Sequence, residues 1–501
     1  MYKLLFINIL FITFGSYSYT QTHGFCGTGA QENHLIRERM FQNRENKSLN
    51  STRSGAIKYV PINYFLTAKN DGTGRLRYIK VLENICDINR IYADQEISFY
   101  IRSINDVNNT FIYDDPSSTF GFAALNNIEK NYNNGINLFV ASKANGSSQG
   151  VLAFYNPTGD YLVSESAQVG GKGYVLAHEI GHFLSLAHTF YGWESTTYDC
   201  SQACPTEVFI GGVSVKVEYF DRELTVNGKK HCLISADGFC DTQADYNCGF
   251  GFNGCVWSGC MVDPDGKGLN PDEKNIMSYF LNNCHEFFSE EQKAAMARDY
   301  ASSARSYLRA TAHTPLPPVE NAPGNPTALI NGFNSVNIKW DAVPNATHYI
   351  LEYAPVSLST PQFKNHILQR TDTTFTNLTK GTKYAWRVTA YNATNPCPKS
   401  TAILSFTNSN FGVGTNDTEL ELSDVSIQYS GLNQYTINLF ANKSELLQFN
   451  LYSVDGKLLS SENLNIQAGA NSIRKYVDGT GLFLFQLSNS QRSISGKFFA
   501  Y

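Results

Sequence analysis

The sequence lacks the features that would direct a protein to nucleic acid or into a membrane. Its 39 Lys and Arg residues are nearly balanced by 44 Asp and Glu residues, and no stretch has the concentrated basic character of a nucleic-acid binder. After Phe14, no apolar run is long enough to cross a bilayer. Hydrophobic residues at 42% and aromatic residues at 13% suffice for packed cores, which excludes a disordered chain.

The first residues, MYKLLFINILFITFGSYSYTQ, have the order of a secretory signal peptide. Lys3 precedes an apolar run from Leu4 to Phe14, and small polar residues follow it. Such a run is too short to serve as a permanent anchor. We therefore expect residues 1–18 to be a signal peptide and the mature protein to be secreted, without a membrane span.

The eleven cysteines fit export to an oxidising compartment. Eight of them are concentrated in one stretch, as Cys200, Cys204, Cys232, Cys240, Cys248, Cys255, Cys260 and Cys284. Their irregular spacing does not match the paired ligands of a zinc ribbon and instead predicts a loop-rich region held by disulfide bonds. Because the total is odd, at least one thiol has no partner within the chain.

The part of the chain that follows the signal peptide divides into a prosegment and a larger domain. Residues 19–54 are polar and charged, as in a short removable prosegment or linker. Residues 55–310 alternate strand and helix patterns and predict an α+β domain with a mixed sheet. The domain should end in a helix after Ser289, which has capping-box spacing with Gln292.

Proline-rich residues 311–325 are expected to be an extended linker. Residues 326–408 then show short alternating strands such as SVNIKW and KYAWRVTAYN, which predict a small β-sandwich. Trp340, Tyr349, Leu378 and Tyr384, within these strands and turns, resemble the core positions of a fibronectin type III module.

Residues 420–501 are again β-patterned and predict a second small β-sandwich. The end of the chain resembles the C-terminal sorting domain of the type IX secretion system, through Gly481, Leu482, Phe483, Gly496 and Lys497. This resemblance implies export by the type IX machinery, followed by removal of the domain or by attachment to the cell surface.

The stretch AHEIGHFLSLAHTF, residues 177–190, carries the chemistry. His178 and His182 lie one helical turn apart on one face, so both imidazoles can bind one ion, as in an H-E-x-x-H zinc motif. Glu179 can then approach a water at the metal rather than the metal itself. A hydrolytic zinc site has about three protein ligands and keeps a position open for water. The motif therefore predicts one catalytic zinc ion with Glu179 as acid and base.

His188 raises a geometric question, because it comes six residues after His182. On a continuing helix it would lie about 240° around the axis. It can bind the same ion only if the helix ends and the chain turns back. Metzincins do this with H-E-x-x-H-x-x-G-x-x-H, in which the glycine tolerates a positive φ. Here Ser185 stands at that position, at a cost on the order of 1 kcal/mol, and we expect the turn to form with His188 as third ligand.

Several motifs together resemble the pappalysin (cytophagalysin) family of metzincin metalloproteases over about residues 23–305. They are HEIGHFLSLAHTF, the CDT of residues 240–242, NIMSY, and Cys284 seven residues after Met277. The resemblance implies a secreted zinc endopeptidase that cleaves proteins or peptides. It implies His178, His182 and His188 as zinc ligands and Glu179 as the catalytic acid/base.

The resemblance also implies further roles. Met277 would form the floor of the site, and Tyr279 would stabilise the oxyanion. Family members bind calcium near the DT loop, which makes Asp241 and Thr242 candidate Ca²⁺ ligands. By analogy, either Cys255 or Cys260 pairs with Cys284.

Cys26, in GFCGTGAQENH, resembles the cysteine switch of the same family. A thiolate is a good zinc ligand and could fill the open position, which would make the protein a latent zymogen. The alternative is a disulfide bond, with Cys86 as the partner. With a cysteine switch, the basic stretch that contains Arg44 and Arg53 is the expected place of activating cleavage.

Two other interpretations of the histidine motif stay open. In a gluzincin the helix would continue, and a downstream glutamate such as Glu207 or Glu218 would be the third ligand. In a non-catalytic adhesin the fibronectin-like module would bind and the zinc site would be a relic, against which the intact Glu179 argues. In a peptidase, residues such as His285 and Glu286 would line the specificity pocket.

Overall fold

A computed structural model describes most of the chain. The described residues are 26–49, 55–146, 150–171, 174–196, 198–249, 252, 254–281, 283–330, 335–356, 363–379, 381–394, 396–408, 422–431, 433–489 and 493–500. The predicted signal peptide, the first part of the prosegment and Arg53 lie outside them. The chain divides into two compact units, the first reaching Pro315 and the second, which also takes in Arg77–Ile79, running from Leu316 to the end.

A five-stranded sheet forms the centre of the first unit. Its strands are β1 (Lys58–Ala68), β2 (Ile97–Asn108), β3 (Ile136–Ala141), β4 (Ala153–Asn156) and β5 (Tyr161–Glu165), in the order β2-β1-β3-β5-β4. All neighbours pair in parallel except β4, which is an antiparallel edge strand. The predicted mixed sheet is confirmed, but the parallel strands make this region α/β rather than α+β. Strands β3 and β5 are buried at every position, as expected of central parallel strands.

Helices connect and flank this sheet. They are α2 (Tyr78–Ile91), α3 (Thr110–Asp114), α4 (Thr119–Glu129), α5 (Tyr174–Phe183) and α6 (Glu290–Ala301), with short 3₁₀ turns η1 (Ala93–Gln95), η2 (Ser166–Gln168), η3 (His231–Leu233) and η4 (Ser303–Arg309). Helix α6 begins as the sequence predicts. The Ser289 side chain accepts from the Gln292 amide, and the Gln292 side chain accepts in turn from the Ser289 amide.

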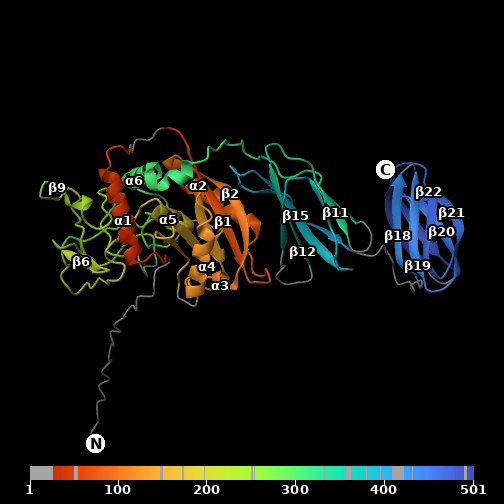
Figure 1. Cartoon of the computed structure of the whole chain (residues 1–501), viewed down its shortest axis with the longest axis horizontal. Coiled ribbons are helices and arrows are strands. Elements are labelled where there is room, and N and C mark those ends of the chain that lie inside the picture. The colour runs from red at the N-terminus through yellow and green to blue at the C-terminus, as the bar shows by residue number, and fades with distance from the viewer. Residues whose placement is uncertain are drawn as a thin grey trace, which may run out of the picture. The chain divides into compact units, whose positions relative to one another are not determined.

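The prosegment contains a helix that its polar composition did not predict. Helix α1 (Ala30–Glu45) buries Asn33, Ile36 and Met40. Figure 1 shows α1, in red, close to α6, in green. The Asn43 amide donates to the Asp299 carboxylate of α6 (2.8 Å), which also pairs with Arg39 (3.1 Å). Tertiary contacts rather than an apolar stripe therefore hold this helix in place.

The cysteine-rich region has little regular structure. Its hairpins are β6 (Glu207–Ile210) with β7 (Val213–Lys216), and β8 (Thr225–Val226) with β9 (Lys229–Lys230). Disulfide bonds join Cys200 to Cys260, Cys232 to Cys240, and Cys255 to Cys284. The predicted stapling and the pairing of Cys255 with Cys284 are confirmed. Cys26, Cys204 and Cys248 carry free thiols, so a Cys26–Cys86 disulfide is wrong.

The second unit begins with an antiparallel β-sandwich. One sheet contains β10 (Thr327–Ile330), β11 (Val336–Lys339) and β14 (Asp372–Phe375). The other contains β12 (His348–Pro355), β13 (Lys364–Leu368), β15 (Lys383–Tyr391), β16 (Lys399–Ser400) and β17 (Leu404–Thr407). Both sheets contribute to one hydrophobic core, as predicted for this segment.

A further antiparallel sandwich ends the chain. Its sheets contain β18 (Leu422–Gly431), β19 (Gln434–Ala441) and β22 (Gly469–Tyr476), and β20 (Glu445–Ser453), β21 (Leu458–Ile466), β23 (Gly481–Ser488) and β24 (Ser493–Ala500). Side chains of both sheets form its core. Across the described parts of the whole chain, no helix combines the length and the apolar character needed to span a membrane.

Candidate metal centre

The chain reverses direction directly after the second histidine of the motif. Helix α5 ends at Phe183. The Ser185 amide donates to the His182 carbonyl (3.0 Å), and the Leu186 amide donates to the Gly181 carbonyl (2.9 Å). These two bonds form a Schellman motif, which requires a left-handed residue after the helix. Ser185 provides it with a φ of 70°, so the predicted turn is present although no glycine supplies it.

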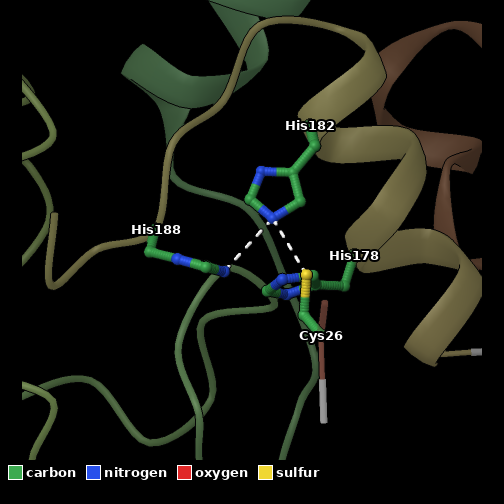
Figure 2. A group of neighbouring side chains, drawn as sticks. All are labelled: Cys26, His178, His182 and His188. Carbon is green, nitrogen blue, oxygen red and sulfur yellow. Dashed lines mark hydrogen bonds between the residues drawn. The ribbon is translucent and has the colours of Figure 1, made fainter. Parts of the chain in front are cut away.

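The reversal brings three histidines and one cysteine together. Figure 2 shows His178 and His182 extending from α5, His188 approaching from the returning loop, and Cys26 beside them. Ligand atoms of all four buried residues lie within 4.8 Å of one another. The Nε2 atom of His182 is 3.2 Å from that of His188 and 3.5 Å from the sulfur of Cys26. Within the described residues, no second group of His, Cys, Asp or Glu side chains converges in this way.

The protonation of the rings shows what the cluster can hold. Each Nδ1 atom faces an acceptor: Ile276 carbonyl for His178 (2.7 Å), Leu186 carbonyl for His182 (2.7 Å) and Glu194 carboxylate for His188 (3.4 Å). These acceptors favour the proton on Nδ1 and leave the Nε2 lone pairs directed at the centre. Burial lowers the pKa of His178 to about 4 and, with repulsion between the rings, lowers the pKa values of the other two well below their usual range.

Three imidazole lone pairs therefore converge, and the Cys26 thiol is the group beside them that carries a proton. The Nε2 atom of His178 is buried and has no hydrogen-bond partner in the described structure. Such convergence is unfavourable unless a cation lies between the donors. Three imidazoles and a sulfur are the ligand types that zinc accepts in tetrahedral sites. The donor set fits zinc.

The N-terminal segment lies across this centre. The Gly27 amide donates to the Ala153 carbonyl on edge strand β4 (2.8 Å), and Cys26 forms a parallel bridge with the same residue. The Cys26 carbonyl accepts from the Tyr279 hydroxyl (3.1 Å). Burial and the Glu179 carboxylate raise the pKa of the Cys26 thiol, and a bound cation would reverse that effect by favouring the thiolate.

Glu179 is fully buried next to the cluster. Its Oε2 atom accepts from the Thr28 hydroxyl (3.2 Å), and its Oε1 atom has no partner in the described structure. The Thr28 oxygen accepts in turn from the Tyr155 amide on β4 (2.9 Å). Burial raises the pKa of Glu179 to about 8, despite the opposing effect of these hydrogen bonds. A carboxyl group that titrates near neutral pH suits proton transfer.

Met277 lies directly against the metal-binding helix. A Cβ atom added to Gly181 of α5 would come within 2.5 Å of the Met277 sulfur, so the helix can approach this closely only because residue 181 has no side chain. The Met277 carbonyl accepts from the Thr189 amide (3.2 Å), next to the third ligand. The ring of Tyr279 lies 4.8 Å from that of His188. The sequence pattern thus placed both residues beside the cluster.

The DT loop lies elsewhere and has structural contacts. The Asp241 carboxylate accepts from the Ser289 hydroxyl (2.7 Å) and from the Glu291 amide (2.8 Å), at the start of α6. The Thr242 hydroxyl donates to Asp237 (3.3 Å). The contacts of Asp241 are those of a residue at a helix start. A calcium site at Asp241 and Thr242 stays a prediction.

Helix α5 ends at Phe183 rather than continuing, which does not fit the gluzincin alternative, and both glutamates considered for it lie outside the cluster. Glu207 is exposed and accepts from the Ser214 hydroxyl (2.7 Å). Glu218 is buried and paired with Arg222 (2.8 Å). Neither belongs to the cluster, in which His188 holds the third position.

The sequence did not predict the residues that support the ligands. Glu194, which is partly buried, accepts from the Gly192 amide (2.8 Å) while it faces His188, and desolvation raises the pKa of Glu194 to about 8. The Asn33 side chain of α1 accepts from the His188 amide (3.3 Å) and donates to the Thr28 carbonyl (3.0 Å). Only the fold brings Asn33 beside His188, whereas Glu194 lies six residues after His188 in the chain and no motif marked it.

Comparison with known proteins identifies one part of the chain. The family profile described as the fibronectin type III domain matches residues 321–404. Residues 321–404 form a fibronectin type III domain. No curated protein sequence matches the chain.

Solved structures that resemble the chain carry the same kind of module. They include the FN5 domain of Drosophila Lar (18% identity, 18% of this chain and 99% of that one, TM-score 0.16), the FN1–FN3 domains of chicken CNTN1 (12%, 36% and 68%, 0.18) and the fn3 domain of human collagen alpha-1(XX) (19%, 21% and 98%, 0.16).

The residues that suggested the fibronectin type III domain have structural roles within it. Trp340, Tyr349, Leu378 and Tyr384 are all buried. The Tyr349 hydroxyl accepts from the Val343 amide (2.9 Å), and the Tyr384 hydroxyl accepts from the Thr379 amide (3.0 Å). Together with the disulfide bonds, a fibronectin type III domain indicates an extracellular protein.

Proposed function

We propose that the protein is a secreted zinc-dependent endopeptidase that its own N-terminal segment holds latent. The observation that supports this most directly is the convergence of three Nε2 lone pairs and one sulfur beside a buried glutamate. Zinc, when bound by His178, His182 and His188, would polarise the scissile carbonyl and make a water more acidic.

The residues around the cluster then have distinct tasks. Glu179 accepts a proton from the attacking water and delivers it to the leaving amine, for which a pKa near neutral is suited. The Tyr279 hydroxyl, now bound to the Cys26 carbonyl, donates to the oxygen of the scissile carbonyl as negative charge develops on it. Met277 packs against α5 at Gly181.

Latency follows from three contacts of one short segment. Cys26 takes a ligand position at the cluster. The Thr28 hydroxyl donates to the carboxylate of Glu179, and the Cys26 carbonyl accepts from the Tyr279 hydroxyl. The segment also pairs with β4, the edge at which an extended peptide could add to the sheet. Activation requires cleavage after this segment, and the basic residues Arg44 and Arg53 are the sites we propose.

The ends of the chain extend this proposal. Residues 1–18 would direct export and would be removed. The C-terminal sandwich, in which β23 with Gly481 pairs with β24, would address the protein to the type IX machinery and to the cell surface. Calcium, if bound near Asp241 and Thr242, would require Asp241 to leave its position at the start of α6.

Metal analysis and a cleavage assay test the proposal together. The full chain should contain about one zinc per molecule, and a protein substrate should be cleaved after the prosegment is removed. A zinc chelator should abolish cleavage, and added zinc should restore it. If the processed protein keeps its zinc and cleaves no protein or peptide, the non-catalytic adhesin interpretation replaces the peptidase.

A further inference from the structure

A cavity adjoins the metal cluster beside residues 278–285, which follow Met277 in the chain. It is partly open to solvent, and the space within it and at its mouth amounts to about 280 Å³. Its lining residues come from the N-terminal segment, α5 and residues 278–285, namely Cys26, Val175, His178, Glu179, Ser278, Tyr279, Phe280 and His285. A substrate bound for attack at the cluster would place a neighbouring side chain in this space.

His285 is the unexplained residue of the cavity. It is 4% exposed, and neither ring nitrogen has a hydrogen-bond partner in the described structure. A neutral imidazole offers one donor and one acceptor. Leaving both unpaired in a buried position is unfavourable unless a ligand completes them.

The orientation of the ring and the charge of the cavity limit what the ligand can be. The ring of Tyr174 packs edge-on against His285, with centroids 6.1 Å apart, and so restricts its rotation. Glu286 does not enter the cavity, because it is exposed and pairs with Lys274 (3.1 Å). Among the residues that line the cavity, Glu179 is the one carboxylate, and its place is beside the cluster. Of the residues that the structure describes, no Lys or Arg lines the cavity.

We propose that His285 makes the enzyme select substrates with an uncharged hydrogen-bonding side chain, such as glutamine, next to the scissile bond. This inference rests on the proposed peptidase function. Val175 and Phe280 would contact the methylene groups of that side chain, and His285 would pair with its polar end. A cationic or anionic side chain finds no opposite charge here, and an aliphatic one leaves the imidazole unpaired.

Peptides that differ only beside the cleaved bond test the proposal. The activated full chain is assayed with glutamine, leucine, glutamate or lysine at each of the two positions flanking the bond. We expect kcat/KM to be highest for glutamine at one of these positions. In His285→Leu, the ratio of kcat/KM for glutamine over leucine should fall by about tenfold or more. The zinc content should not change.

A second variant provides the matched control. His285→Gln keeps a donor and an acceptor, so it should retain more of the preference for glutamine than His285→Leu does, and it decides the matter if the leucine variant does not fold. An unchanged ratio in both variants, or a wild-type preference for leucine, overturns the role of His285 while leaving the peptidase intact. If the wild-type protein cleaves no peptide, the proposed function itself fails, and the inference fails with it.

Discussion

The metal-centre unit and the fibronectin type III domain differ in which of their buried polar groups have hydrogen-bond partners. In the fibronectin type III domain, the buried hydroxyls of Tyr349 and Tyr384 each accept from a nearby amide and fix a turn. In the metal centre, acceptors such as His178 Nε2 and Glu179 Oε1 are buried without donors. In the fibronectin type III domain, the described buried atoms without a partner include the indole nitrogens of Trp340 and Trp386, which are single donors in the core, whereas in the metal centre the unpaired acceptors lie close together, where a cation could bind them.

Comparison with known proteins identified the fibronectin type III domain. The fibronectin type III domain is defined by a pattern of core positions spread over residues 321–404, and a family profile detects such a pattern. The metal centre depends on a few residues from distant parts of the chain, such as Cys26 and His188, which lie together only in the folded protein. The predictions below test the comparison by separating effects on zinc binding and activity from effects on folding stability.

Replacing the catalytic carboxylate should give the largest effect. Glu179→Gln keeps the size and burial of the side chain but removes its ability to take a proton, so we expect kcat to fall by about 10²–10⁴-fold. Zinc content, measured by mass spectrometry of the metal, should not change. Glu286→Gln is the matched control, because Glu286 is exposed and pairs with Lys274. Equal activity of the two variants would contradict the role of Glu179.

Removing the third histidine should separate the two regions. We expect His188→Ala to lower zinc affinity by more than the roughly 10–100-fold typical of losing a supporting residue, as measured by competition with a chelator. Trp386→Ala removes a buried side chain of the fibronectin type III domain and should cost about 3–5 kcal/mol there. It should leave zinc affinity unchanged. If Trp386→Ala lost zinc and His188→Ala did not, the zinc site would not be at His188.

Loosening the N-terminal segment should raise the activity of the unprocessed chain. Cys26→Ala removes the sulfur from the ligand position, and because a tethered ligand acts at high effective concentration we expect a gain of about 10²-fold. Thr28→Val removes one hydrogen bond to Glu179 and should give a smaller gain. Rates are measured before any cleavage of the prosegment. If neither variant is more active than the wild type, the segment does not hold the enzyme latent.

The supporting carboxylate of His188 should have a moderate effect. Glu194→Ala leaves the Nδ1 atom of His188 without its acceptor, and we expect zinc affinity to fall by about 10–100-fold. Glu194→Gln keeps an oxygen acceptor and should recover part of the loss. Identical affinities for both variants would show that Glu194 serves packing alone.

The smallest expected effect concerns the turn itself. Ser185 holds a φ of 70° and a buried hydroxyl without a partner, so Ser185→Gly should stabilise the first unit by about 1 kcal/mol in thermal unfolding. Asn345→Gly is the control in the fibronectin type III domain, where φ is 65°, and its gain should be smaller because asparagine tolerates this conformation. A destabilised glycine variant would mean that Ser185 is not strained.

The sequence predicted those parts of the site that depend on local geometry. The distance from His182 to His188 required a reversal, and a Schellman turn at Ser185 provides it. The helix start at Ser289 followed from side-chain spacing in the same way. Both depend on residues that are near one another in the chain, where bond geometry leaves few choices.

Long-range contacts were beyond what the pattern could reveal. Helix α1 has no apolar stripe, and it forms because Arg39 and Asn43 meet Asp299 some 250 residues later in the chain. Glu194 and Thr28 look like ordinary loop residues until the fold places them beside His188 and Glu179. Sequence spacing does not contain this information, because it arises only when separate elements pack.

The pairing of Gly27 with the edge strand has a consequence for the unprocessed chain outside catalysis. A sheet edge with unpaired amides and carbonyls invites another chain to add to it, and β4 is such an edge. While Cys26 and Gly27 lie along β4, neighbouring molecules have less unpaired strand to join, so this segment also reduces aggregation through the sheet edge. Removal of this segment in the proposed activation would open the edge of β4 to a substrate and would also leave it open to aggregation.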